Sequence, residues 1–504
     1  MEKYGVPIVF LVVFAVCVVS AWRGTYPEPV VHDEFSYLLA ADTYAHGRLT
    51  NPAHPHWEHF ESFHIIAKPS YVSKYPAAPG LVLALGKLLF GHPIFGAWLA
   101  VAAAAAAIFW MLRIWFPPWW ALAGTVIPTV RMLLLWTDNY WVSTLPVLGG
   151  ALLFGGFVKL TKEPRIRYSV LLGIGVAILA TSRPFEGLLM TLPVGVALLV
   201  WAGRKLRSRD RRSVFRAVLP AAVVVGLTLT WMAYYNYRTT GDARTMAYSI
   251  YTDEYIPAGE FAVMPRKEEP DYRHAEFRAF ARWRLDAWEA SRERFGFNGP
   301  TWWKARKFFK FYIGSAMLLP LIIGLTRGFR SHRGVRFAVV TCLTVMLGSL
   351  VAVNYFPRYF APILGVTMVP LVYGLREISE WRWRDRPAGR RIAIGLVLVY
   401  AVLLPPWMAT RLSPSANAPR NRTIVADRLE NVDGNHLVVV RYRPGHSLHD
   451  EWVYNDADLE ESRIVWARNM DPARNGQLID YFSDRRIWLV ELGESSVSLV
   501  PYPR

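Results

Sequence analysis

The stretch IFGAWLAVAAAAAAIFWML (residues 94–112) contains no charged side chain, and it decides the structural class of this protein. A helix of this length spans roughly 30 Å, which is the thickness of the hydrocarbon core of a bilayer. Uncharged runs of similar length recur along the first 410 of the 504 residues. Only 19% of the residues are charged, whereas a soluble protein has about a quarter. The sequence therefore predicts a polytopic α-helical membrane protein.

About eleven membrane-spanning helices are expected from these runs. The first run lacks a small-residue cleavage site and further runs follow it, so we interpret it as an uncleaved helix rather than a secretory signal. The expected spans are residues 4–22, 94–115, 119–136, 140–160, 168–183, 185–203, 214–236, 308–326, 335–353, 359–376 and 391–409. The apolar stretch 78–91 is short and contains Lys87, so it predicts a juxtamembrane or partly inserted helix.

The basic residues are distributed as orientation signals. Basic links such as KLTKEPRIRY and GRKLRSRDRRSVFR follow the fourth, sixth, eighth and tenth expected spans. The positive-inside rule places such links in the cytoplasm. The N-terminus is then cytoplasmic, and the long loops 23–93 and 237–307 and the C-terminal segment are extracytoplasmic, with the cytoplasmic (inner) membrane as the expected location. Because this pattern accounts for the net charge of +18, nucleic acid is not an expected partner.

The composition changes after residue 410. The runs HLVVVRY, RIVWAR, RIWLVEL and VSLVPY indicate short β-strands, and PARNGQLIDYFSDR between the second and the third indicates a helix. We therefore expect a small extracytoplasmic α/β domain at residues 411–504 after a transmembrane domain at residues 1–410. Cys17 and Cys342 both lie in apolar runs, which argues against a disulfide framework.

The first external loop contains the polar motif that points to chemistry. It includes VHDEFSYLLAADTYAHGRLTNP (31–52), in which Asp33 and Glu34 follow closely on the first span. A carboxylate that is partly desolvated at a membrane interface has a raised pKa and can act as a general base. The alternative is a helix N-cap followed by a solvated acid.

The order of motifs in this loop, from the Asp-Glu pair through GRLTNP to KYPAAPG (74–80), resembles the GT-C superfamily of membrane glycosyltransferases that use polyprenyl-phosphate sugars. The similarity is to the protein O-mannosyltransferase and aminoarabinose-transferase branches, glycosyltransferase family 39. It covers residues 4–115 by motif and extends to about residue 410 as topology, although KYPAAP separates the prolines that the family has as a pair. The resemblance implies inverting transfer by a hydroxyl that attacks the anomeric carbon. It also implies that Asp33 is the catalytic base and that Glu34 supports it or holds the acceptor.

The leaving phosphate requires positive charge that is placed in advance. Candidates near the external ends of the spans are Lys74, Arg183 in TSRPFEG and Arg358 in NYFPRYFAP. Tyr355 and Tyr359 flank Arg358 and are candidate hydrogen-bond donors to a phosphate oxygen. The alternative for the arginines is contact with lipid headgroups, and for the tyrosines it is an aromatic belt.

The stretch HPHWEHFESFH (54–64) is dense in histidine and glutamate, and we interpret it as a contact to the sugar or the acceptor. The residues assigned to this role are His56, Trp57, Glu58, His59, Glu61 and His64, together with Glu186 of TSRPFEG. No metal cofactor is expected to be required. A divalent ion on His56, His59 and Glu61 is the alternative, and plain loop packing is the third interpretation.

The leading interpretation is an integral-membrane glycosyltransferase (a hexosyl- or pentosyltransferase) that acts on the extracytoplasmic face. Its expected partners are a polyprenyl-phosphate sugar, a glycan, lipid or protein acceptor, and membrane lipids. The stretch AYSIYTDEYIP in the second external loop is interpreted as a lid over the site or as a solvated loop. The alternative function is a transporter or flippase for lipid-linked glycans, which is expected to have charges inside its spans. Here the span interiors are mostly uncharged and the polar groups collect at one face, which favours the enzyme.

Overall fold

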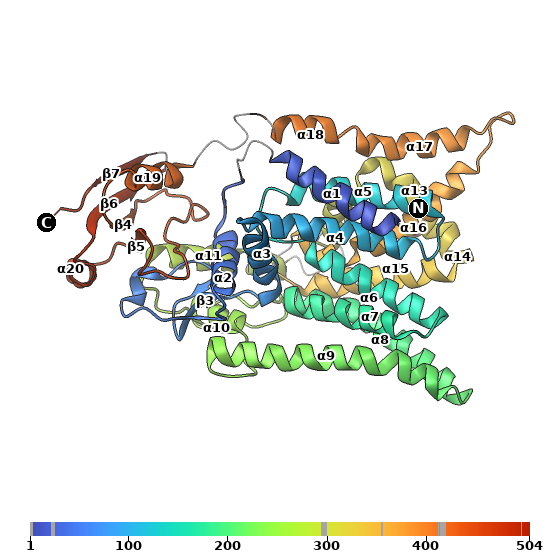
Figure 1. Ribbon diagram of the computed structural model, residues 1–504, viewed down its shortest axis with the longest axis horizontal. Coiled ribbons are helices and arrows are strands. Elements are labelled where there is room, and N and C mark those ends of the chain that lie inside the picture. The colour runs from blue at the N-terminus through green and yellow to red at the C-terminus, as the bar shows by residue number, and fades with distance from the viewer. Residues whose placement is uncertain are drawn as a thin grey trace.

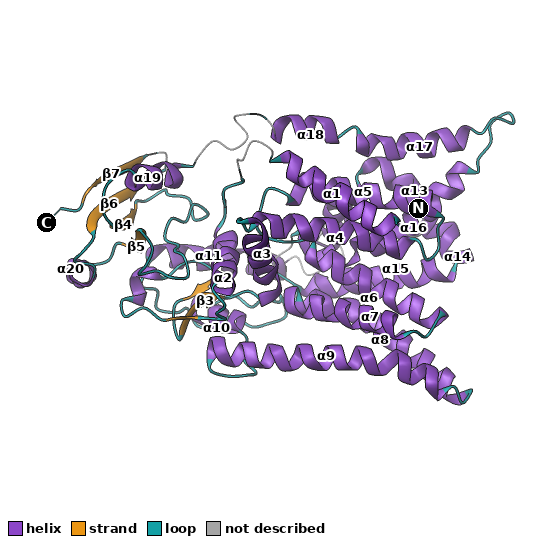
Figure 2. Ribbon diagram, in the orientation of Figure 1, coloured by secondary structure: helices purple, strands orange, loops and turns teal. Residues whose placement is uncertain are grey.

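The computed structural model describes residues 4–21, 26–293, 300–353, 356–411, 413, 420–494 and 496–503, and of residues 300–302 it describes the backbone only. The molecule is elongated, with a bundle of long helices on one side and a smaller part that contains the strands on the other (Figure 1). Colouring by secondary structure shows that the strands are confined to the side away from the bundle (Figure 2). The chain is therefore a polytopic helical membrane protein with a small sheet domain, as the sequence predicts.

Eight helices within the described ranges are long and apolar enough to cross a membrane, or nine if a bent pair counts as one span. They are α4 (Ile94–Leu112), α5 (Pro118–Trp136), α6 (Leu145–Lys162), α8 (Pro184–Arg207), α9 (Arg211–Thr240), α15 (Arg333–Gly348) continued by η5 (Ser349–Val351), η6 (Pro357–Ile363) continued by α16 (Leu364–Ser379), and α17 (Ala388–Ala401) with α18 (Leu404–Arg411). The bent pair, at 98°, joins α12 (Pro300–Phe308) and η2 (Phe309–Ile313) to η3 (Ser315–Met317), α13 (Leu318–Ile323), η4 (Gly324–Gly328) and α14 (Phe329–Ser331).

Three shorter apolar helices complete the bundle, namely α1 (Gly5–Ser20), α3 (Ala77–Phe90) and α7 (Ile166–Ser182). Each of the eleven predicted spans overlaps one of these helices or those above, and the apolar stretch 78–91 forms α3. Helix α3 crosses α4 very closely, because a Cβ atom on Gly86 would lie 2.1 Å from the backbone nitrogen of Gly96. This contact requires glycine, and it holds the end of the first external loop against the bundle.

Small elements lie outside the bundle in the two long loops. They are α2 (His32–Ala45), β1 (Asn51–Pro52), η1 (Trp57–Phe60), β2 (Ile65–Ile66), β3 (Ser70–Ser73), α10 (Ala247–Tyr255) and α11 (Ala275–Glu293). The three short strands form an antiparallel sheet in the order β1-β3-β2.

The C-terminal part is a four-stranded sheet with the order β5-β4-β6-β7, in which β7 alone is antiparallel to its neighbour. Its elements are α19 (Asn421–Glu430), β4 (His436–Tyr442), β5 (Ile464–Arg468), α20 (Pro472–Tyr481), β6 (Arg486–Leu492) and β7 (Val497–Pro501). The four predicted strands and the helix between the second and the third are confirmed.

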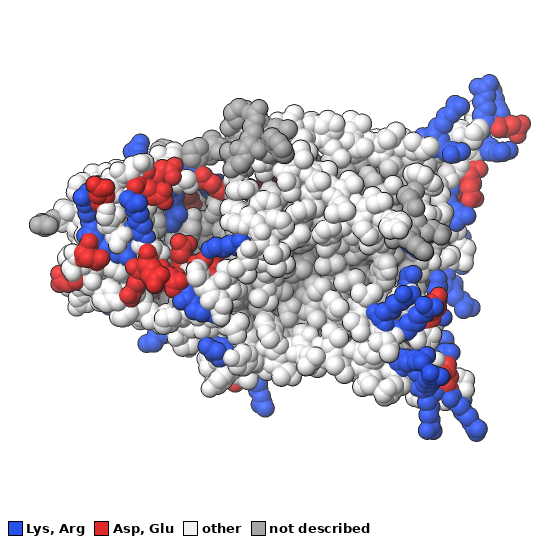
Figure 3. Space-filling view, viewed as in Figure 1, with Lys and Arg blue, Asp and Glu red and all other residues white. Residues whose placement is uncertain are grey.

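Charged side chains gather at the two ends of the molecule and leave an uncharged band around the helices (Figure 3). The end that carries the α8–α9 and α16–α17 connections is mostly basic, whereas the end with the C-terminal sheet carries both signs (Figure 3). An uncharged band between two charged ends is the surface that a bilayer-spanning protein requires.

Candidate functional site

Helix α2 begins at the Asp-Glu pair because Glu34 caps its N-terminus. The Glu34 carboxylate accepts hydrogen bonds from the backbone N–H groups of Val30 at 2.8 Å and Val31 at 3.1 Å. It accepts a third from the N–H of Tyr140 at 3.0 Å, which ties α2 to the α5–α6 connection. Glu34 is buried, and burial raises its pKa. Its contacts show Glu34 as an anchor for α2, whereas Asp33 has different partners.

The hairpin of β2 and β3 places His64 and Lys74 side by side. Ile65 pairs with Ser73, so the residues just outside this pair are neighbours. The carbonyl of His64 accepts hydrogen bonds from the Lys74 N–H at 3.1 Å and from the Ser36 hydroxyl at 2.6 Å. His64 has a φ of 64°, a left-handed conformation that is uncommon for a residue with a side chain. The hairpin and α2 together therefore fix the backbone of His64 next to Asp33.

Asp33 contacts three side chains from three separate segments. The Tyr75 hydroxyl donates a hydrogen bond to its Oδ1. The Nε2 atom of His64 lies 3.5 Å from Oδ1, and a guanidinium nitrogen of Arg358 lies 3.6 Å from Oδ2. The Asp33 side chain is 17% exposed, so a small ligand can reach it while most of the carboxyl group is shielded from water.

The pKa of Asp33 is lowered, and the expectation of a raised pKa is wrong. Burial by itself would raise the pKa, but His64, Arg358 and the hydrogen bond from Tyr75 outweigh burial. Burial also lowers the pKa of His64 well below its ordinary value, so His64 is neutral at neutral pH and Arg358 is the permanent cation beside the carboxylate. Asp33 is therefore ionised throughout the neutral range.

Lys74 is buried in a cage of tyrosine rings. Its Nζ lies 4.2 Å from the ring centroid of Tyr251 and 4.9 Å from that of Tyr248, both on α10. Burial lowers the pKa of Lys74 to about 7. A cavity of about 30 Å³ joins Lys74 to Trp231 and Met232 of the spanning helix α9. The stretch that was interpreted as a lid thus covers Lys74 at the membrane end of the site.

The two predicted phosphate-binding arginines both lie at connections between helices of the bundle. Arg183 occupies the turn between α7 and α8, and its guanidinium stacks on the Tyr359 ring at 4.8 Å. Arg358 stacks on the Trp141 ring at 4.2 Å. Tyr355 lies outside the described residues.

Most of the polar residues in the stretch 54–64 join the first loop to other segments instead of facing Asp33. Glu61 is buried, accepts a hydrogen bond from Tyr255 at 2.6 Å and lies 3.1 Å from Nε2 of His274. The Nδ1 atom of His59 meets the carbonyl of Arg468 at 2.9 Å. The other contacts are those of Glu58, whose carbonyl bonds His274, of Trp57, whose ring stacks with Arg273, and of His56, whose ring lies against Tyr481. Glu186 lies in the first turn of α8, where it interacts electrostatically with Arg183.

The structure adds residues to the site that the sequence analysis did not select. Tyr75 follows the predicted Lys74, and His32 precedes the predicted Asp33, so both had a signal in the motif. His449, from the C-terminal part, lies 3.2 Å from Nε2 of His32 through its own Nδ1. No spacing rule connects residues more than four hundred positions apart, so sequence inspection had no means to find His449.

The histidines also change the candidate metal ligands. Within the described ranges, one group has three potential ligand atoms within 4.8 Å of one another, and it consists of His32, Asp33 and His64. The contacts of Glu61 and His59 described above point to different partners. The alternative metal site on His56, His59 and Glu61 is therefore not formed by the structure.

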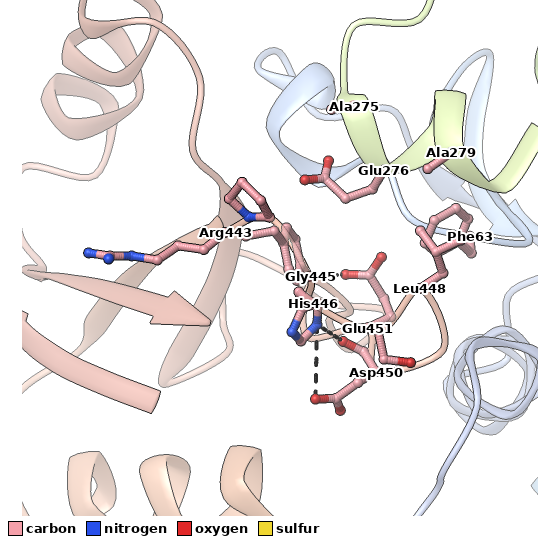
Figure 4. Close-up of a pocket in the computed structure, with 13 residues that line it drawn as sticks. Phe63, Ala275, Glu276, Ala279, Arg443, Gly445, His446, Leu448, Asp450 and Glu451 are labelled. Carbon is pink, nitrogen blue, oxygen red and sulfur yellow. Dashed lines mark hydrogen bonds and ion pairs between the residues drawn. The ribbon is translucent and has the colours of Figure 1, made fainter. Parts of the chain in front are cut away.

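A larger cavity of about 240 Å³ lies between α11 and the loop that follows β4. Figure 4 shows Glu276 of α11 and Glu451 of the loop near this space, whereas the Arg443 side chain extends away from it. Phe63 lines the cavity and packs on the His32 ring with 5.2 Å between centroids. Polar space is thus available one ring away from the residue that precedes Asp33.

Comparisons with known proteins identify the fold. No family model matches the sequence. A curated human protein, PRA1 family protein 2, is 41% identical over 87 residues, which is 16% of this chain and 45% of that protein. The chain thus spans less than half the length of that relative.

Solved structures match nearly the whole chain. ArnT from Cupriavidus metallidurans bound to undecaprenyl phosphate is 12% identical, with 97% of this chain and 93% of that chain covered at a TM-score of 0.55. The Archaeoglobus fulgidus oligosaccharyltransferase tethered with an acceptor peptide is 10% identical, with 97% and 69% covered at 0.52. The oligosaccharyltransferase AglB of the same organism, in complex with an inhibitory peptide and a dolichol-phosphate, is 11% identical, with the same coverage at 0.51. The chain therefore has the GT-C fold that the first-loop motif predicts.

Proposed function

We propose that this protein is an integral-membrane glycosyltransferase that transfers a sugar from a polyprenyl-phosphate donor to an acceptor hydroxyl, with inversion at the anomeric carbon. The observation that carries the proposal is an ionised, partly shielded Asp33 that shares one end of the helix bundle with the cations Lys74, Arg183 and Arg358. The solved GT-C structures support it, because undecaprenyl phosphate and dolichol-phosphate are bound by proteins of this fold.

Each group has a defined part in this reaction. The acceptor oxygen attacks the anomeric carbon, its proton passes to the Asp33 carboxylate, and the bond from carbon to the phosphate oxygen breaks with its electron pair leaving on the phosphate. Lys74, Arg183 and Arg358 stabilise the charge on the departing phosphate. Attack from the side opposite the leaving group inverts the configuration.

Donor binding would also strengthen the base. In the free protein Arg358 faces Asp33 at 3.6 Å and lowers its pKa. A bound phosphate competes for the same guanidinium and withdraws part of its charge from Asp33. The pKa of Asp33 then rises when the donor is present, so the carboxylate becomes a better proton acceptor only in the loaded site.

The position of Lys74 suits a donor that reaches the site from the bilayer. The cavity at Lys74 is lined by α9 residues whose helix is largely exposed to lipid. An isoprenoid chain can then remain in the bilayer along α9 while its phosphate meets Lys74. We place this end of the bundle on the extracytoplasmic side of the inner membrane, since the opposite end is the basic one (Figure 3).

The test uses the full chain in lipid nanodiscs with a set of polyprenyl-phosphate hexoses and pentoses. Released polyprenyl phosphate is measured for the wild type, Asp33→Asn and the control Asp253→Asn. Asp253 is an exposed α10 carboxylate that pairs with Lys267. Asp33→Asn should lower turnover about 100- to 10,000-fold, and Asp253→Asn should leave it unchanged. Wild-type turnover in Asp33→Asn would remove Asp33 as the base, and no release from any donor by the wild type would contradict the proposed reaction.

A further inference from the structure

We propose that His32, Asp33 and His64 bind one divalent transition-metal ion, with Zn²⁺ as the preferred type. One ring nitrogen from each histidine and one carboxylate oxygen lie within 4.8 Å of one another at the start of α2 and the start of β2. Two imidazoles and one carboxylate are a ligand set that suits zinc, cobalt, manganese and iron rather than magnesium or calcium.

The distances within the group fit such an ion. Ligand atoms about 2.0–2.1 Å from a tetrahedral zinc ion are about 3.4 Å apart. The separation of 3.5 Å between His64 Nε2 and Asp33 Oδ1 already matches this value. The widest separation, up to 4.8 Å, requires the group to close by about 1 Å, which a rotation of one imidazole ring supplies.

Two nitrogens of this cluster are buried and lack partners. Within the described part of the chain, the Nδ1 atoms of His32 and His64 have no hydrogen-bond partner, although His32 is 4% exposed and His64 is 6% exposed. Buried polar atoms are nearly always satisfied in folded proteins, so these two call for a ligand. A metal ion satisfies the Nδ1 atom of His32 directly, because the other nitrogen of that ring is already occupied.

His449 holds His32 from the outside. Its Nδ1 lies 3.2 Å from Nε2 of His32, and its ring packs edge-on against Trp283 of α11. Histidines that bind metals usually have their second nitrogen held by such an outer partner, which fixes the tautomer and the ring orientation. The C-terminal part thus contributes a positioning residue to a site that the first loop builds.

The carboxylate can face an ion and a cation together. Arg358 meets Oδ2 of Asp33, which leaves Oδ1 on the histidine side. The bond from Tyr75 to Oδ1 is the contact that an incoming ion must displace or share. Three protein ligands leave a fourth position open for water or a hydroxyl oxygen, whose acidity a bound ion increases. Under the proposed function, that oxygen belongs to the acceptor; the binding inference itself does not depend on sugar transfer.

The experiment measures ion binding by the full chain purified without a histidine tag and stripped with a chelator. Bound zinc is counted after gel filtration, and Co²⁺ titrations are followed by the visible absorption of the ion. The wild type should bind one Zn²⁺ or Co²⁺ per chain, and a large excess of Mg²⁺ should not compete. His64→Gln and Asp33→Asn should weaken binding at least about 100-fold, and His449→Ala should weaken it about 10- to 100-fold. His56→Gln is the matched control in the same loop and should change affinity less than twofold.

The outcomes separate this inference from the proposed function. A stripped wild type that takes up no stoichiometric ion overturns the metal site, as does His64→Gln with wild-type affinity while the protein remains folded by its melting temperature. Equal competition by Mg²⁺ also overturns it. If the protein binds no ion and Asp33→Asn still abolishes transfer, the proposed function holds alone. If an ion binds and Asp33→Asn transfers sugar normally, the metal site holds alone.

Discussion

Replacement of Arg358 by glutamine is expected to move the acid limb of the pH profile to higher pH. A guanidinium nitrogen of Arg358 lies 3.6 Å from Asp33 Oδ2, and this charge helps to lower the pKa of Asp33 against the effect of burial. At an effective dielectric constant of about 20, two unit charges at this distance attract by about 4 to 5 kcal/mol. We expect roughly half of this to be lost, because the Tyr75 hydrogen bond remains and water enters the vacated space.

A loss of about 2 kcal/mol corresponds to a rise of about 1.5 in the pKa of Asp33. The sign follows from the ionised form being the active base. In the wild type, the pKa of Asp33 lies below the ordinary value for aspartate, so activity should persist to below about pH 4 and fall only in stronger acid. In Arg358→Gln, burial is opposed less, and activity should fall at a pH about 1.5 higher.

The assay is the initial rate of polyprenyl-phosphate release at low donor concentration, measured across pH. This rate gives kcat/KM, which reports the pKa values of the free enzyme. Arg358→Lys is the matched control because it keeps the charge, and its acid limb should stay close to that of the wild type. An unchanged acid limb in Arg358→Gln would refute the pairing of Arg358 with Asp33, and an equal rise in Arg358→Lys would show that charge is not the cause.

Three further outcomes are expected from the same structure. Lys74 has a pKa of about 7 and loses its charge as the pH rises through that value, so the donor KM of the wild type should rise up to about tenfold per pH unit above it, and Lys74→Arg should hold it constant; a flat KM in the wild type would contradict phosphate binding by Lys74. Glu61→Gln removes the buried charge that faces His274, which should lower the free energy of unfolding by about 2 kcal/mol and reduce the melting temperature while transfer by the folded protein persists; loss of transfer without loss of stability would return Glu61 to the site. A cysteine at position 447 should react with an impermeant maleimide in intact cells, and one at position 384 only after permeabilisation, as the basic end predicts; the reverse pattern would invert the topology.

The residues of the site differ in how far the linear order reveals them. Asp33 and Lys74 lie in motifs of the first loop, and Arg183 and Arg358 lie at turns between apolar runs, so each had a local signal. The stretch 54–64 has equally polar residues, yet most of them bind the first loop to α11 and to the C-terminal part. Histidine and glutamate are suited both to chemistry and to buried cross-links, and the sequence alone does not separate these two uses.

The sequence by itself determined the membrane class, the positions of the helices, the strands of the C-terminal sheet and the carboxylate on which the function depends. These properties follow from local patterns, since apolar length, strand alternation and charge placement are read within some twenty residues. Only the tertiary structure decided that the pKa of Asp33 falls, that Glu34 caps its helix, and that His32 and His64 converge on Asp33 with His449 behind them. Electrostatic and coordination effects depend on distances of a few ångströms between atoms, and the folded chain sets these between residues that are up to four hundred positions apart.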